Sequence, residues 1–180
     1  GPGWERATER DARVVLRLAT RDGVARSAGV ERAFGGGAFN AEYNNREPFT
    51  FTPPADATRV ELVTILSGHG QADGTNCAEW CDHRHTFTLN GDALPTIQPS
   101  PVTTGALRGC ARRADEGVPP GQYGNWAIGR AYWCPGLPVD ARRDDITEQV
   151  RLGEANELTY SASFRAGEDP PGGDIALNAY

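Results

Sequence analysis

The sequence predicts an all-β protein: an antiparallel jelly roll or β-sandwich with long loops. Short runs of alternating or β-branched residues recur along the chain, and each has the length of a single strand. The 22 Gly and 13 Pro residues separate these runs by turns. No helical period persists over several turns, so the pattern favours sheets packed face to face over a helical fold.

The strongest strand signal is the run Arg59–Ser67, which is nearly continuous and β-branched, as in the core of a sandwich. Asn90-Gly91 predicts a hairpin turn. We expect Gly35–Gly37 to be a turn, Asp145–Val150 to be one helical turn or the start of a strand, and 95–127 to be mostly long loops. The expected strands are Arg13–Thr20, Phe49–Thr52, Arg59–Ser67, His83–Leu89, Glu157–Phe164 and Ile175–Tyr180.

The chain length of 180 residues suits one domain with a real core and is short for two. We expect residues 1–3 to be a tail or the remnant of a purification tag, since Gly1-Pro2 is commonly left by tag removal. Residues 4–180 then form a single domain. The last expected strand stops at Tyr180 in the middle of its pattern, which suggests that this strand is clipped.

The charge balance argues against a nucleic-acid partner. The formal net charge is −6, and such a partner would require a basic face. No apolar run approaches the roughly 20 residues that a membrane-spanning helix needs, so we expect no membrane span.

The four cysteines predict disulfides and therefore an oxidising compartment, secreted or periplasmic. Their spacing favours a short loop closed by Cys77–Cys81 and a longer one closed by Cys110–Cys134. Free or zinc-bound thiols are the alternative, although a four-cysteine zinc site usually has two short pairs and this chain has one.

Four groups of residues, in this order, resemble one known family. They are Ile65–Gly70; Cys77-Ala78-Glu79-Trp80-Cys81 with His85-Thr86-Phe87; Cys110-Ala111; and Gly124-Asn125-Trp126-Ala127 with Arg130-Ala131-Tyr132-Trp133-Cys134-Pro135-Gly136. The pattern resembles the C-terminal domain of the peptide-N-glycosidase F family, over about residues 12–180.

The resemblance implies an exported protein built from two jelly-roll domains side by side, with the same two disulfides. The family cleaves the amide between an Asn side chain and the first N-acetylglucosamine of an N-glycan, in the groove between its domains. Glu79 occupies the position of a functional carboxylate, and Arg130 lines the groove with Trp133 close by. The principal catalytic Asp belongs to the other domain, so we expect this chain to be inactive without an upstream or partner β domain.

The residues near the second disulfide have the composition of a sugar-binding surface. Sugars stack on aromatic rings, and Arg donates to hydroxyl or acetamide groups. We therefore predict substrate contacts, with N-glycans or glycoproteins as partners, from Trp80, Arg130, Tyr132 and Trp133. Trp126 is instead expected to pack against the Cys110–Cys134 disulfide. The alternative for Glu79 is an exposed loop acid beside a structural disulfide.

All three histidines fall close together in the sequence, at His69, His83 and His85. The H-x-H pair lies two residues apart on an expected strand, so both rings point to one face, a spacing that suits copper or zinc. The same two-domain fold occurs in the copper monooxygenases that hydroxylate peptides. Their second domain binds copper through an H-x-H pair and a Met, and this chain has no Met. A three-histidine site is the possible substitute; otherwise His85 bonds within the loop cluster and the others lie at the surface.

Three hypotheses follow. The leading one is a glycan-directed amidase module, a hydrolase domain that uses Glu79, Arg130 and Trp133 and requires no cofactor. The second is a copper- or zinc-binding domain. The third is a non-catalytic module that binds carbohydrate or protein.

Overall fold

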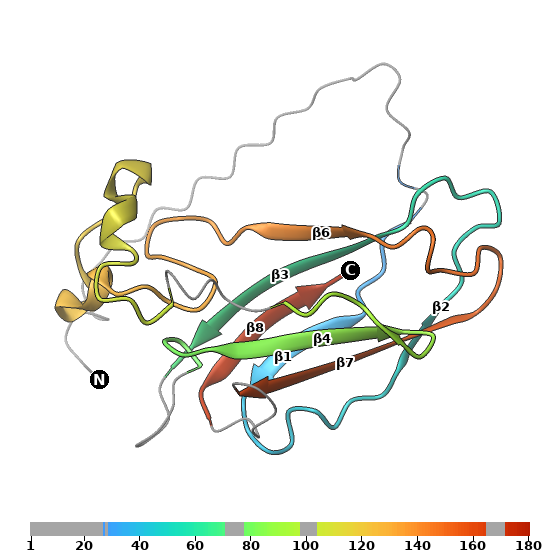
Figure 1. Cartoon of the computed structure of the whole chain (residues 1–180), viewed down its shortest axis with the longest axis horizontal. Coiled ribbons are helices and arrows are strands. Elements are labelled where there is room, and N and C mark those ends of the chain that lie inside the picture. Colours follow the sequence, from blue (N-terminus) through green and yellow to red (C-terminus); the bar gives the residue numbers. More distant parts are fainter. Residues whose placement is uncertain (1–26, 28, 71–77, 98–103, 165–171) are drawn as a thin grey trace, which may run out of the picture.

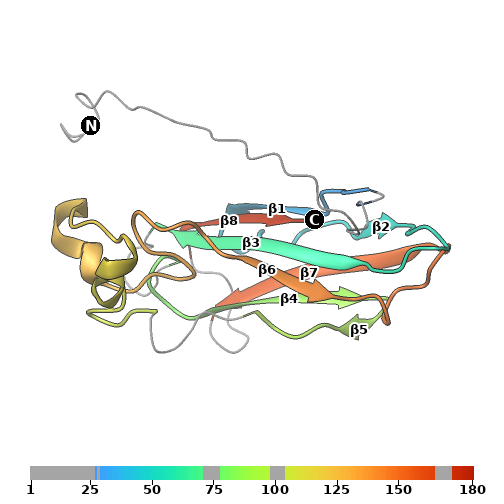
Figure 2. The ribbon, with the colours of Figure 1, turned by 90° about the horizontal axis from the view of Figure 1, so that it is seen from above.

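The computed structural model describes residues 27, 29–70, 78–97, 104–164 and 172–180. In this part of the chain, two antiparallel sheets lie face to face (Figure 2), with strand orders β1-β8-β3-β6 and β2-β7-β4-β5. The predicted antiparallel β-sandwich is confirmed. The strands are β1 (Phe34–Ala38), β2 (Phe49–Phe51), β3 (Glu61–His69), β4 (His83–Leu89), β5 (Asp92–Ala93), β6 (Ala141–Asp145), β7 (Asn156–Phe164) and β8 (Asp174–Ala179).

The core lies between the two sheets because each central strand alternates buried and exposed side chains. Every second residue of β4 and of β7 is buried, and the residues between them are partly or fully exposed. An aromatic cluster fills the middle, with the Phe87 and Tyr160 ring centroids 4.8 Å apart and Phe34 5.6 Å from Tyr160.

Short 3₁₀ helices and loops gather at one end of the sandwich, where β3 ends and β4 begins (Figure 1). The helices are η2 (Ala111–Glu116) and η3 (Gln122–Ala127). The Cys110–Cys134 disulfide is present as predicted. Trp126 packs against it together with Val118 and Leu137, which confirms the structural role expected for Trp126.

The opposite end of β4 closes with the predicted hairpin. Asn90 and Gly91 have φ values of 52° and 93°, so both central residues adopt the left-handed conformation of a type I′ turn. Leu89 then pairs with Asp92 across the turn.

Two sequence expectations about strands were wrong. Gly35–Gly37, expected to be a turn, lies in β1 and pairs with β8 through an irregular register. A Cβ on Gly36 would lie 1.9 Å from the Ile175 carbonyl oxygen, so glycine is what allows this close pairing. Strand β6 was missed because its sequence, Ala-Arg-Arg-Asp-Asp, has no hydrophobic pattern; charges are common on such edge strands.

Other expectations have mixed outcomes. Asp145–Val150 starts as the last residue of β6 and continues as one helical turn, with the Val150 amide donating to the Ile146 carbonyl. The expected strand Arg13–Thr20 and the Cys77–Cys81 disulfide involve residues outside the described ranges. No helix in the described part of the chain is long and apolar enough to span a membrane.

Candidate functional site

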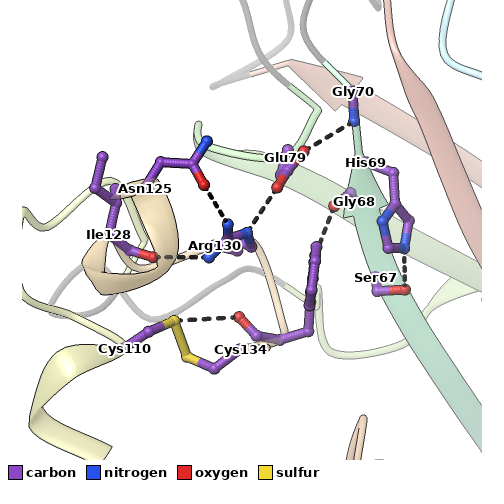
Figure 3. Close-up of polar contacts among 11 residues, drawn as sticks. Ser67, Gly68, His69, Gly70, Glu79, Cys110, Asn125, Ile128, Arg130 and Cys134 are labelled. Atoms are coloured by element: carbon purple, nitrogen blue, oxygen red, sulfur yellow. Dashed lines mark hydrogen bonds and ion pairs between the residues drawn. A yellow bond between two sulfur atoms is a disulfide. The ribbon is translucent and has the colours of Figure 1, made fainter. Parts of the chain in front are cut away.

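The candidate site lies at the loop-rich end of the sandwich, where residues 78–82 and 130–134 meet the end of β3 (Figure 3). Backbone hydrogen bonds join the three segments. The Ala131 amide donates to the Glu79 carbonyl at 2.7 Å, the Gly68 amide donates to the Ala131 carbonyl at 3.2 Å, and the Glu79 amide donates to the Gly70 carbonyl at 3.2 Å. The short loop that carries Glu79 is therefore held from two sides.

Gly68 allows this assembly because it leaves room for another backbone segment. A Cβ at Gly68 would lie 1.8 Å from the Ala78 carbonyl oxygen and 2.7 Å from Nε2 of His83. Any larger residue would displace the peptide immediately before Glu79. The sequence Ser67-Gly68-His69 at the end of a strong strand contained this signal, since a glycine inside a strand often marks a close backbone approach.

The Glu79 carboxylate is held by two donors, and its side chain is 18% exposed. Nε of Arg130 lies 2.6 Å from Oε1, and the Gly70 amide donates to Oε2 at 3.2 Å. Figure 3 shows the carboxylate between Arg130 and Gly70. Its orientation is fixed while part of it remains open to solvent, which suits a group that orients a ligand or a water molecule.

The Arg130 guanidinium is fully buried and already has partners on several sides. Besides Glu79, it donates to the Ile128 carbonyl and to Oδ1 of Asn125. Its Cζ atom lies 4.5 Å from the Trp80 ring centroid and 4.8 Å from that of Trp133, a cation–π arrangement with two rings. In this structure Arg130 orients Glu79 rather than presenting free donors to the surface. Asn125, its amide partner, was not among the predicted site residues.

The Trp133 ring is fixed at the end of β3. Its Nε1 donates to the Gly68 carbonyl at 2.8 Å, and its centroid lies 4.9 Å from the His69 ring. Nε2 of His69 in turn bonds to Oγ of Ser67 at 2.8 Å. The structure therefore brings Glu79, Trp80, Arg130 and Trp133 together, with His69 at their edge.

Tyr132 points differently from its neighbours because its backbone is left-handed, with φ of 71°. This conformation is strained for a bulky residue. The Tyr132 hydroxyl donates to the His83 carbonyl at 3.0 Å, and burial raises the pKa of this hydroxyl well above its usual value. The ring packs beside His83 and His85 and also lines a cavity next to Trp133. The sugar contact expected for Tyr132 stays a prediction.

The other two histidines lie in the core. His83 and His85 have no exposed surface, and Nδ1 of His83 lies 2.7 Å from Nε2 of His85. Burial lowers the pKa of His83 to about 4 and that of His85 well below its usual value, so both rings are neutral near neutral pH. His69 bonds elsewhere, and no group of three His, Cys, Asp or Glu side chains in the described part of the chain could hold a metal ion.

A cavity of about 240 Å³ lies beside β3 and is lined by Ile97, Arg130, Tyr132 and Trp133. Thr64 and Arg142 also line it. The Thr64 hydroxyl is buried there and has no hydrogen-bond partner among the described residues. An unpartnered polar group in a cavity of this size is a feature of sites that take a polar ligand or water.

Comparison with known proteins decides the family. The sequence model described as "Peptide-N-glycosidase F, C terminal" matches residues 38–180. The chain belongs to this family. It is 38% identical, over 118 residues, to peptide-N(4)-(N-acetyl-β-D-glucosaminyl)asparagine amidase F of Elizabethkingia miricola, a match that covers 63% of this chain and 30% of that protein. The resemblance deduced from the Cys-Ala-Glu-Trp-Cys and Arg-Ala-Tyr-Trp-Cys motifs is thus confirmed.

Solved structures agree with this assignment. A crystal structure of peptide-N(4)-(N-acetyl-β-D-glucosaminyl) asparagine amidase matches with a TM-score of 0.55 at 25% identity, covering 87% of this chain and 44% of that one. A structure of PNGase F, described as a glycosylasparaginase from Flavobacterium meningosepticum, matches with a TM-score of 0.54 over the same shares. The chain therefore spans less than half the length of these relatives.

Proposed function

We propose that this chain is a glycan-directed module of a peptide-N-glycosidase F-like amidase, with the glycosylated asparagine of a glycoprotein as its ligand. The observation that carries the proposal is the pairing of Glu79 with Arg130 between two Trp rings, in a chain of this family. The two motifs that carry the resemblance to the family contribute the two halves of this pair.

Glu79 has the properties of one half of a two-carboxylate site. Its Oε1 accepts from Arg130 and its Oε2 accepts from the Gly70 amide, and the side chain as a whole remains 18% exposed. Cleavage of a bond to a sugar commonly uses two carboxylates on opposite sides of that bond. In our proposal Glu79 orients the substrate or the attacking water, and the second acid comes from an upstream or partner β domain. The chain alone then binds glycans but does not hydrolyse them.

The ring of Trp133 and the adjacent cavity provide the sugar contact in this proposal. Sugar rings stack on indole faces, and the cavity is large enough for part of a sugar residue. Arg130 acts through Glu79 and the two indoles and does not bind the sugar directly. We also propose that the protein is exported, in keeping with the Cys110–Cys134 disulfide.

The test is calorimetric titration of the chain with a glycopeptide that carries N-acetylglucosamine on Asn. We expect saturable binding, weakened about tenfold by Glu79→Gln, a change that keeps the side-chain shape but removes the charge. A parallel assay with a denatured glycoprotein should show no glycan release. Absence of binding by the unsubstituted chain would refute the proposal, and Glu79-dependent release would refute the need for a second domain.

The metal-binding hypothesis remains a separate prediction of the sequence. To hold copper or zinc, His83 and His85 would each have to free one ring nitrogen, for example by breaking the hydrogen bond between them. His69 could keep its Nε2 bond to Ser67 and bind through Nδ1. Metal analysis of the purified chain beside His83→Ala tests it directly. Stoichiometric copper or zinc that is lost in the variant would establish the site.

A further inference from the structure

A continuous chain of side-chain hydrogen bonds crosses the core and ends at the peptide before Glu79. The Tyr43 and Tyr160 hydroxyls are 2.9 Å apart, and Tyr160 lies 2.6 Å from Nδ1 of His85. Nε2 of His85 lies 2.7 Å from Nδ1 of His83, and Nε2 of His83 lies 2.8 Å from the Ala78 carbonyl oxygen. All of these side chains are buried, so solvent does not supply alternative partners.

The carbonyl at the end of this chain sets the direction of every hydrogen bond in it. A carbonyl oxygen can only accept, so Nε2 of His83 carries a proton, and a neutral ring then leaves Nδ1 as an acceptor. Nε2 of His85 must therefore donate to His83, and Nδ1 of His85 must accept from the Tyr160 hydroxyl. Tyr43 in turn donates to Tyr160. With both rings neutral, each of the four links has one donor and one acceptor.

An added proton cannot be accommodated without rearrangement. A proton on Nδ1 of His83 would force His85 to change tautomer and both hydroxyls to turn, and Tyr43 would then need a new acceptor. A second proton would place two donors face to face between the rings. Two charged groups of the described residues act on the pair in opposite directions: Asp82 favours protonation of His83, and Arg46, whose Cζ lies 4.3 Å from the Tyr43 ring centroid, disfavours protonation of His85.

The chain of hydrogen bonds ends at the Ala78 carbonyl, where the backbone of the candidate site packs closely against Gly68. The Ala78 carbonyl fits against Gly68, where a Cβ would lie 1.8 Å from its oxygen. The next residue, Glu79, uses its amide, its carbonyl and both carboxylate oxygens in hydrogen bonds. A shift of the Ala78 peptide therefore moves the backbone that orients the carboxylate.

We propose that Tyr160, His85 and His83 are positioning residues, which hold the Ala78 peptide through this one-directional chain and thereby set the orientation of Glu79. The importance of that orientation for a ligand rests on the proposed function above. The chain of hydrogen bonds itself does not depend on the proposed function, because it can be tested on the unliganded protein.

The first test is nitrogen NMR of the histidine rings near neutral pH. The expected result is that His83 and His85 are both neutral with the proton on Nε2, and that these protons exchange slowly with solvent. An Nδ1-protonated tautomer on either ring would overturn the proposal, because the hydrogen bonds from Tyr160 to the Ala78 carbonyl could not then all point in one direction.

The second test is amide hydrogen exchange of Ala131, which donates to the Glu79 carbonyl, in Tyr160→Phe. This variant keeps the ring but removes the donor to His85, and we expect exchange at Ala131 to accelerate about tenfold. The matched control is Ile146→Val, a small core truncation beside Val60 at the other end of β3, which should lower global stability without this local effect. Equal acceleration in both variants would overturn the proposal.

The third test uses a partial replacement of His83. Gln at this position can still donate to the Ala78 carbonyl, whereas Leu cannot. We expect His83→Gln to retain slower exchange at Ala131 and tighter glycopeptide binding than His83→Leu; equal exchange in the two would contradict the role of the Ala78 bond. If the unsubstituted chain binds no glycopeptide, the proposed function fails, and the exchange data still decide the positioning role.

Discussion

Two polar pairs meet at residues 78 and 79, one neutral and one charged. The His83–His85 pair is neutral, fully buried and linked by hydrogen bonds through the core. The Glu79–Arg130 pair is charged, and only its carboxylate reaches the surface. The comparison teaches that the core side of the loop is bonded by neutral groups, while the buried charge of Arg130 is balanced by a carboxylate that remains partly exposed.

The largest effect should follow from removing one partner of the charged pair. Glu79→Ala leaves the Arg130 guanidinium buried without a counter-charge, which we expect to destabilise the fold by about 3–4 kcal/mol. Glu79→Gln keeps an acceptor for Arg130 and should cost about half as much. Urea denaturation measures both values. If Glu79→Ala lowered the free energy of unfolding by no more than an ordinary surface substitution does, the pair would not stabilise this region.

A second effect should appear where the two pairs meet, at Gly68. Gly68→Ala places a Cβ against the Ala78 carbonyl and Nε2 of His83, and we expect a loss of about 3 kcal/mol. The control is Gly121→Ala, where an added Cβ has no neighbour within 4 Å. Thermal or urea denaturation compares the two. Equal stability would mean that the crowding at Gly68 relaxes at little cost.

The central strands of the fold were largely predictable from the sequence, but the edge strands β1 and β6 were not. Strands β4 and β7 were expected at nearly their observed bounds because their alternation reflects burial on one face. Strands β1 and β6 were missed because Gly-Gly-Gly and Arg-Arg-Asp-Asp carry no such pattern; their pairing depends on partners far away in the sequence.

The proximity of the candidate site residues was predictable from the sequence, and the directions of their side chains were less so. The family motifs bring Glu79, Arg130 and the two Trp rings together. The inward direction of Tyr132 depends on a single left-handed residue, and the link from Tyr160 to the site depends on the packing of β7 against β4. Neither follows from local sequence patterns.

The neutral pair should make stability depend on pH. The pKa of His83 is lowered to about 4 and that of His85 is also lowered, so between the ordinary value of 6.5 and about 4 the unfolded chain binds protons that the folded protein does not. The contribution of the two rings to the free energy of unfolding is therefore complete above pH 6.5. It falls as the pH decreases through this window, by up to about 1.4 kcal/mol per pH unit for each ring. Urea denaturation across this range should show a shallower slope in His83→Gln. An unchanged slope in that variant would contradict a neutral His83.

The smallest effect concerns Thr64, which belongs to neither pair. Its buried hydroxyl has no partner in the part of the chain that the structure describes, so Thr64→Val should stabilise the fold by about 1 kcal/mol. The same variant should weaken glycopeptide binding if the sugar enters the cavity that Thr64 lines. Denaturation and calorimetric titration of this single variant separate the two effects. A loss of stability would indicate that the hydroxyl is hydrogen-bonded to water in the cavity.

The most direct test of the central claim is NMR mapping of the glycopeptide complex. If the module binds the glycosylated asparagine at the charged pair, titration should shift the indole signals of Trp80 and Trp133 and the amide signal of Glu79. The histidine ring signals of the buried pair should move little. Saturable shifts centred on any other surface, or no shifts at all, would contradict the account.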